Sequence, residues 1–151
     1  MITAASYGRV CQAPAAVSAQ RLRIVIAEDD DRLATLVEDL LGGDGRFDVV
    51  GRASDGDEAV RLCEKHSPDL VLMDIGMPRR DGIDATRLIH DRDPGRHVVI
   101  YTGSDEYDDV ARADAAGAAG YLHKDALTSP ELADALVVLH ANYVSGVPDP
   151  D

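Results

Sequence analysis

Short apolar runs alternate with helical patterns along most of the chain. Five runs have the composition of β-strands, and they occupy residues 22–27, 47–51, 70–73, 98–101 and 120–122. The first and fourth are continuously apolar rather than alternating, which is typical of strands buried on both faces of a parallel sheet. The clearest helical pattern is an apolar stripe made by Leu33, Leu36, Val37, Leu40 and Leu41. Strands and helices are therefore expected to alternate.

The predicted helices occupy residues 31–41, 57–66, 83–90, 107–116 and 129–143. Gly42-Gly43 ends the first helix, and Ser129-Pro130-Glu131 is a typical start for the last. Strict alternation with short connections predicts an α/β, flavodoxin-like fold. Its doubly wound, five-stranded parallel sheet should have the order 2-1-3-4-5 and carry five helices. The domain is expected to span 21–143, between a flexible N-terminal tail (1–20) and a disordered C-terminal tail (144–151).

Composition narrows the choice of partners. The 151-residue chain has a formal net charge of -13. This balance argues against direct DNA binding by this chain and against binding to acidic membranes. No apolar run approaches the length of a membrane span. Cys11 and Cys63 lack the spacing of a metal or redox motif, so two reduced thiols in a cytoplasmic protein are expected.

Candidate chemistry gathers where the predicted strands end. In an open parallel sheet, ligands bind beyond the carboxyl ends of the strands, at the point where strand order reverses. The residues that follow strands one, three, four and five there include three acids in a row, one further acid, a hydroxyl and an amine: Glu28, Asp29, Asp30, Asp74, Thr102 and Lys124. Carboxylates that share a crevice suit a hard cation such as Mg2+, which often binds together with phosphate oxygens. Asp is also a known nucleophile toward phosphorus.

Each of these residues has a simpler interpretation. The run of acids at 28–30 could cap the helix that starts near Asp31. Asp74 could cap a turn, Lys124 could be a solvated charge, and Thr102 could be an ordinary strand residue. Their convergence on one end of the sheet favours a joint site for metal and phosphate.

Four spaced motifs resemble the CheY-like receiver domain of bacterial response regulators. They are RIVIAEDD, DLVLMDIGMPRRDGI, VVIYTG and AGAAGYLHK, and the match runs from about Leu22 to about Tyr143. The third-strand segment is the most specific, because Asp74, Met77-Pro78 and Asp81-Gly82 fit the family pattern together. The form of the last motif is similar to receivers of the LuxR-type (NarL-like) branch.

The resemblance implies a role for each site residue. Asp74 would accept a phosphoryl group from a sensor histidine kinase in a two-component phosphorelay. Asp29 would ligate Mg2+ directly, Glu28 through water, and Gly76 through its backbone carbonyl, with Asp74 completing the protein ligands. Mg2+ is thus the expected cofactor.

Further roles concern the phosphoryl group and the response to it. Thr102 and Lys124 would bind the phosphoryl oxygens. Tyr121 would be a switch aromatic that changes rotamer as Thr102 moves inward, although a packed strand aromatic is the simpler alternative. The surface near the fourth helix, fifth strand and fifth helix would then change its partner preference.

The resemblance also shapes the expected partners. The acidic pair is Glu-Asp where Asp-Asp is commoner, and Asp125 follows Lys124 where many members have proline. Partners would be the kinase and either a downstream output protein or a missing output domain, and phosphorylation could produce a homodimer. Chain length does not separate a single-domain regulator from an excised receiver.

Two rival functions stay open on sequence. A metal-dependent aspartyl-phosphate phosphohydrolase would usually need a second carboxylate two residues after the nucleophile, where this chain has Gly76. A receiver-like interaction module that is never phosphorylated would be expected to lack part of the acid, threonine and lysine set. We therefore expect no enzyme activity beyond self-phosphorylation and self-dephosphorylation. The five histidines lie in different segments and are expected to be surface or hydrogen-bonded side chains.

Overall fold

One parallel sheet forms the centre of the molecule. The computed structural model describes residues 21–77, 79–103 and 107–146. Its strands are β1 (Leu22–Ala27), β2 (Phe47–Ala53), β3 (Leu70–Asp74), β4 (Val98–Thr102) and β5 (Gly120–His123), in the order β2-β1-β3-β4-β5. All four strand pairs are parallel. The predicted flavodoxin-like sheet order is confirmed.

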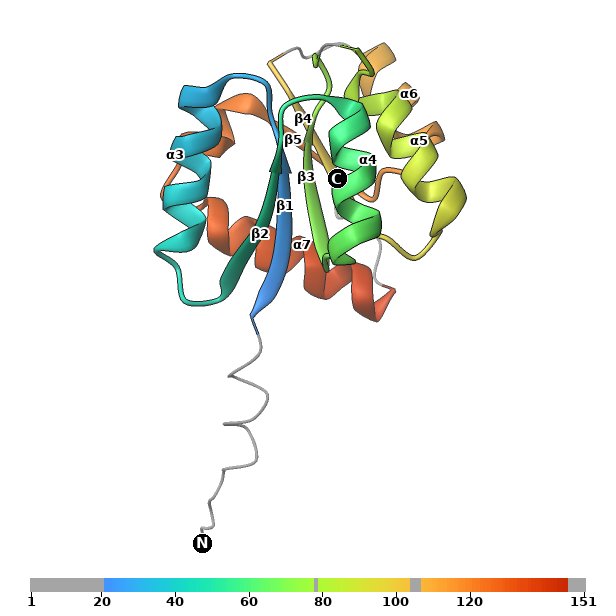
Figure 1. Cartoon of the computed structure of the whole chain (residues 1–151). Helices are drawn as coiled ribbons and strands as arrows, with labels where there is room; N and C mark the ends of the chain where they lie inside the picture. The colour runs from blue at the N-terminus through green and yellow to red at the C-terminus, as the bar shows by residue number, and fades with distance from the viewer. Residues whose placement is uncertain (1–20, 78, 104–106, 147–151) are drawn as a thin grey trace, which may run out of the picture.

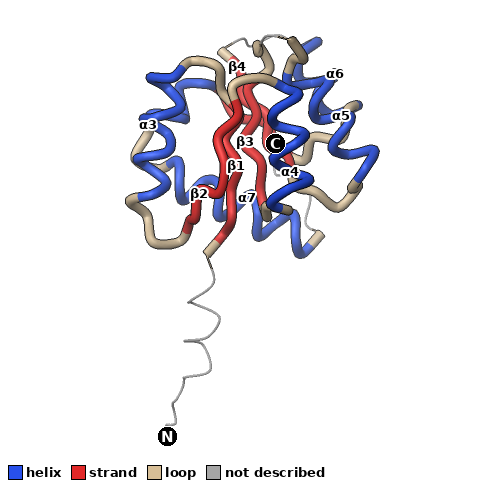
Figure 2. The backbone as a smooth tube through the Cα atoms, in the orientation of Figure 1, coloured by secondary structure: helices blue, strands red, loops and turns tan. Residues whose placement is uncertain are grey.

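Helices cover both faces of this sheet. They are α3 (Asp31–Gly42), α4 (Gly56–His66), α5 (Gly82–Arg92), α6 (Tyr107–Ala115) and α7 (Leu132–Ser145). The apolar contacts place α3 and α7 on one side of the sheet and α4, α5 and α6 on the other. In Figure 1, α3 lies to the left of the strands and α4, α5 and α6 lie to their right. Figure 2 shows the strands as a central layer between these two groups. This is the three-layer arrangement expected when helices connect parallel strands.

The core has one apolar cluster on each side of the sheet. Every residue of β3 and β4 is buried, which agrees with their continuous apolar sequences. One cluster joins alternate strand residues to α4, α5 and α6, and the other joins the remaining strand residues to α3 and α7. Both β3 and β4 are thus packed on both faces, and this packing positions the polar residues at their ends.

Acidic caps begin three of the helices on the side where the strands end. Asp30 accepts hydrogen bonds from the backbone N–H groups of Arg32 and Leu33 and caps α3. Asp55 caps α4 and Asp81 caps α5, each by accepting a backbone N–H three residues ahead. Such side chains satisfy N–H groups that have no partner inside the helix. The chain therefore changes direction sharply at this edge of the sheet.

Some boundaries differ from those predicted. The strands β3 and β4 each include one more residue, Asp74 and Thr102. Ser129-Pro130-Glu131 forms a turn, and α7 begins at Leu132. A 3-10 helix that was not predicted spans Lys124–Thr128, and its five residues are too few to show helical periodicity.

The chain ends also bear on the predicted boundaries. Helix α7 continues to Ser145, two residues beyond the expected domain end at 143. The predicted N-terminal tail (1–20) lies outside the described residues, as do Cys11, Pro78 and residues 147–151 of the predicted C-terminal tail. Val144 and Ser145, which were predicted to belong to that tail, are helical. Among the residues that the structure covers, no helix combines the length and apolarity needed to cross a bilayer.

Candidate functional site

Three carboxylates from two adjacent strands meet at the carboxyl edge of the sheet. Glu28 and Asp29 directly follow β1, and Asp74 is the last residue of β3, the neighbour of β1 in the sheet. One carboxylate oxygen from each of the three lies within 4.8 Å of the others. Glu28 and Asp74 are buried, whereas Asp29 is exposed. The structure therefore brings together the three acids that the sequence placed at the site.

Glu28 is held by hydrogen bonds on both of its carboxylate oxygens. Its Oε1 accepts the hydroxyl of Tyr101 at 2.6 Å, and its Oε2 accepts the backbone N–H of Asp30 at 3.0 Å. The side chain is only 2% exposed. A buried glutamate with both oxygens bonded has little rotational freedom, so its orientation is well defined.

Burial and mutual repulsion disfavour the fully ionised form of this cluster. Burial, reinforced by the nearby Asp74 carboxylate, raises the pKa of Glu28 to about 7, against the effect of its hydrogen bonds. Burial also raises the pKa of Asp74, although the N–H of Gly76 and the Lys124 ammonium act in the opposite direction. A hard divalent cation would remove the cost of holding these charges together. The donor set, which is made of oxygen atoms, fits such an ion.

The third acid of the run has a different task. Asp30 caps α3, so the capping interpretation is right for Asp30. It is not sufficient for Glu28 or Asp29, whose carboxylates lie beside that of Asp74. The run thus divides into two site acids and one helix cap.

The hydroxyl and the amine arrive from the two strands beyond β3. Thr102 is the buried last residue of β4 and pairs with His123 of β5, directly before Lys124. The ammonium of Lys124 acts on the Asp74 carboxylate and favours its ionised form. A Cβ atom at Gly103 would lie 3.7 Å from Cδ of Lys124, so the lysine side chain passes close to the backbone there. The Lys124 ammonium is therefore close enough to act on Asp74, and Thr102 lies at the end of the strand next to β3.

Tyr121 lies on the strand next to the one that ends in Thr102. It is half-buried on β5, pairs with Ile100 of β4, and packs against the apolar cluster on the side of α4, α5 and α6. Thr102 is two residues after Ile100 and so projects to the same face of the sheet. The predicted switch aromatic and the predicted phosphoryl ligand thus share one face.

The loop after β3 is folded tightly around Asp74. The N–H of Gly76 donates to Oδ1 of Asp74 at 3.2 Å, and the N–H of Gly82 donates to the carbonyl of Ile75 at 2.8 Å. Gly76 is exposed, and no atom of the described residues lies within 4 Å of where its Cβ would be. This places the predicted carbonyl ligand in the loop that borders the acids.

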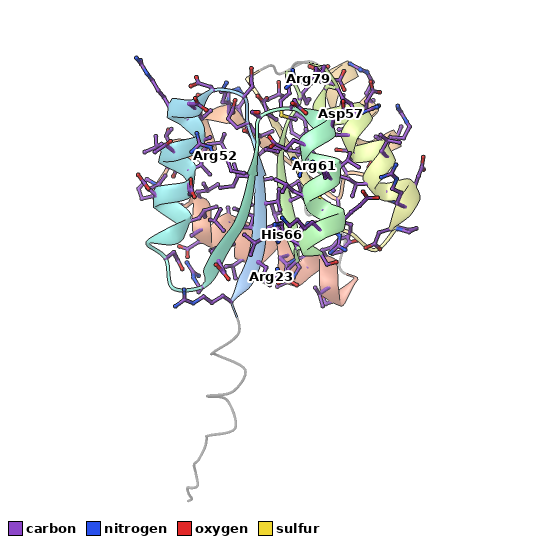
Figure 3. The ribbon with its side chains drawn as sticks, in the orientation of Figure 1. Arg23, Arg52, Asp57, Arg61, His66 and Arg79 are labelled. Carbon is purple, nitrogen blue, oxygen red and sulfur yellow. The ribbon has the colours of Figure 1, made fainter. Side chains whose placement is uncertain are left out.

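The same loop is tied to the start of α4. Arg79 donates from Nε and Nη2 to Asp55, and Arg80 donates to Asp57 at 2.6 Å. The N–H of Gly56 also donates to the carbonyl of Arg80 at 3.0 Å. Figure 3 shows Arg79 and Asp57 at the end of the molecule where α4 begins. The two arginines therefore connect the loop to the start of α4 through ion pairs and do not form a free basic patch.

Sequence reasoning missed two contacts. The sequence does not indicate that the hydroxyl of Tyr101 donates to the site acid Glu28, because only the strand register brings the two residues together. The prediction that every histidine is exposed or fully hydrogen-bonded is only partly right: within the described part of the chain, the buried Nε2 of His97 and the buried Nδ1 of His90 have no hydrogen-bond partner. The Nδ1 of His97 lies 3.0 Å from Nδ1 of His140 on α7.

Comparison with known proteins agrees with this geometry. The family model described as "Response regulator receiver domain" matches residues 24–137. Transcriptional regulatory protein PdtaR from Mycobacterium tuberculosis is 45% identical over 68% of this chain and 49% of its own length. Chemotaxis protein CheY from Halobacterium salinarum is 34% identical over 76% of this chain and 92% of its own.

Solved structures give the same result. The signal receiver domain of the response regulator NarL from M. tuberculosis superposes with a TM-score of 0.76 at 30% identity, covering 81% of this chain and 98% of that one. A LuxR-family two-component response regulator from Aurantimonas sp. has a TM-score of 0.75 at 31% identity, covering 82% and 87%. The chain spans about half the length of PdtaR and of NarL from Escherichia coli. The chain belongs to the response regulator receiver domain family, with NarL/LuxR-type and CheY-like receivers among its structural neighbours.

Proposed function

We propose that this receiver accepts a phosphoryl group on Asp74 from a sensor histidine kinase. One observation carries the proposal: the buried Asp74 carboxylate lies within 4.8 Å of those of Glu28 and Asp29 and is also acted on by the Lys124 ammonium. The three acids would supply oxygen ligands for Mg2+, Glu28 through water, with the backbone carbonyl of Gly76 as a further ligand. Bound there, Mg2+ would offset negative charge on the transferring phosphoryl oxygens.

The protein side chains then have distinct tasks. The Asp74 carboxylate attacks phosphorus in line, while the N–H of Gly76 holds Oδ1 and thereby orients the nucleophile. Lys124 binds a phosphoryl oxygen as a point charge, and Thr102 donates its hydroxyl to another. The kinase histidine leaves as the new acyl phosphate bond forms. No other chemistry is required of the chain, so we propose that it is not an enzyme in its own right.

The new phosphoryl charge also provides a switch. Thr102 and Lys124 are drawn toward it, and Tyr121 rotates into the space that Thr102 leaves on their shared face of the sheet. The surface near α6, β5 and α7 then favours a different partner. That partner is a downstream output protein, an output domain of a longer protein, or a second copy of the chain. The free, buried thiol of Cys63 supports a cytoplasmic location.

Labelling with acetyl phosphate tests this proposal against its rivals. Labelling should require Mg2+ and should be abolished by a chelator. Sustained turnover of a phosphomonoester would instead favour the phosphohydrolase. Failure to bind Mg2+ or beryllofluoride would favour an interaction module that is never phosphorylated.

A further inference from the structure

Tyr101 has a buried hydroxyl that contacts the acid cluster. It lies on β4, pairs with Asp74 of β3, and is 1% exposed. Its hydroxyl donates to Oε1 of Glu28 at 2.6 Å, whereas the carbonyl oxygen of Ala27 lies farther away, at 3.4 Å. A buried tyrosine hydroxyl normally has a partner, since leaving it unpaired is costly. Glu28 is clearly the principal partner here.

The bond matters because Glu28 has a long side chain. Glutamate has one more rotatable bond than aspartate, so holding its carboxylate in one position costs more conformational entropy. The Tyr101 hydroxyl fixes one oxygen and the N–H of Asp30 fixes the other. Each oxygen keeps a further lone pair for a metal ion or for a metal-bound water. The two donors therefore orient the carboxylate without using up its capacity to bind a cation.

The hydroxyl also favours the charged form of its partner. A hydrogen bond to an ionised carboxylate is shorter and stronger than one to a neutral carboxyl. The same ring packs on the side of the sheet that α3 and α7 cover, within the apolar cluster there. A phenylalanine would preserve this packing and remove only the hydroxyl. Tyr101→Phe therefore separates the contribution of the ring to packing from the contribution of the hydroxyl to positioning Glu28.

We infer that Tyr101 is a positioning residue for divalent cation binding: its hydroxyl holds the Glu28 carboxylate in the orientation that the cation requires. The inference rests on the proposed function, because it assigns Tyr101 a task at the same Mg2+ site. Partners of this kind, which orient a metal ligand without touching the metal, typically change metal affinity by roughly 10- to 100-fold when they are removed.

The direct test is calorimetric titration of the full chain with Mg2+, without any phosphoryl donor. Tyr101→Phe should weaken Mg2+ binding by roughly tenfold. Tyr143→Phe is the matched control: Tyr143 stacks on His97 at a ring distance of 4.2 Å and touches no site acid among its described contacts, so its affinity should match the wild type. An unchanged affinity in Tyr101→Phe would overturn the inference.

A double-mutant cycle distinguishes loss of the Tyr101–Glu28 hydrogen bond from a general folding defect. Glu28→Asp shortens the arm and withdraws the carboxylate from the hydroxyl. If the two residues act as a pair, adding Tyr101→Phe to Glu28→Asp should cause little further loss of Mg2+ affinity. Full additivity would contradict the pairing. Failure of the proposed function looks different, because wild type itself would then bind no Mg2+ and Asp29→Asn would change nothing.

Discussion

Gly82 packs directly against the backbone carbonyl of Asp74. A Cβ atom at Gly82 would overlap that carbonyl oxygen and would also lie close to Cα of Ile75. Both obstacles are backbone atoms at the end of a fully buried strand, so neither can move aside easily. The close approach brings the start of α5 against the residue that carries the proposed chemistry.

Gly82→Ala should therefore destabilise the protein and displace Asp74. Overpacking of this kind costs about 1–3 kcal/mol, which denaturant unfolding would measure. Gly42→Ala is the control, since no atom lies within 4 Å of the added Cβ there and the residue ends α3. That control should be neutral or slightly stabilising. Equal stability of the Gly82 and Gly42 variants would show that the loop adapts without cost.

Gly76 leaves open space beside Asp74, and we expect this space to limit the lifetime of the phosphoryl group. It is exposed, and among the described residues no atom lies within 4 Å of a Cβ built there. Gly76→Leu should fit and should shield the acyl phosphate from water, lengthening its half-life several-fold. Decay of the labelled protein would be followed by mass spectrometry. Gly45→Leu, at a similarly open but distant glycine, should decay like wild type; a matching rate for Gly76→Leu would refute the shielding.

Asp55 connects α4 to the loop that follows β3. Its side chain is 7% exposed and accepts from the N–H of Glu58, while its partner Arg79 is 68% exposed. Asp55→Ala removes a helix cap and leaves the backbone N–H of Glu58 without its acceptor, so it should cost about 1–2 kcal/mol of unfolding free energy. Arg79→Ala should cost less than about 1 kcal/mol, because one partner is largely solvated. The reverse ranking in urea unfolding would show that the ion pair outweighs the cap.

His97 should make stability depend on pH. Burial, and to a lesser extent His140, lowers the pKa of His97 to about 4 from an ordinary value of 6.5. Between these values the unfolded chain binds more protons than the folded one, so unfolding free energy should fall as pH falls through that window. Glu28 and Asp74 have raised pKa values and give the opposite slope.

The contribution of His97 to the pH dependence of the unfolding free energy is therefore the difference in that dependence between wild type and His97→Leu. Denaturant unfolding at pH 7 and at pH 4.5 would measure it. Wild type should lose more stability than the variant on acidification, because the variant lacks the group that becomes protonated. Parallel losses in the two proteins would show that burial does not hold the pKa of His97 below its ordinary value.

The fold was predictable from sequence because continuous apolar runs identify buried strands. The polar end of a strand is less visible: Asp74 and Thr102 extend β3 and β4 by one residue each, and hydrophobicity does not signal that. The short 3-10 helix after β5 was missed for lack of periodicity. These errors are small because the apolar interior, not the strand ends, determines the sheet.

The site acids were predictable because each lies within two residues of the end of an apolar run. The pair formed by Tyr101 and Glu28 was not, since 73 residues separate the two and only register brings them together. The same holds for His97, directly before β4, and His140 on α7, which are 43 residues apart in the sequence. Sequence order shows which residues end strands, whereas contacts across strands depend on the packed structure.

The central claim is that Asp74 is the phosphoacceptor, and phosphoryl labelling of a variant that lacks this carboxylate tests it most directly. Wild type, Asp74→Asn and Asp39→Asn, the last an exposed acid on α3, would be incubated with acetyl phosphate and Mg2+ and analysed by intact mass spectrometry. Wild type and Asp39→Asn should gain one phosphoryl group, and Asp74→Asn should gain none. Undiminished labelling of Asp74→Asn would contradict the assignment of Asp74 as the phosphoacceptor.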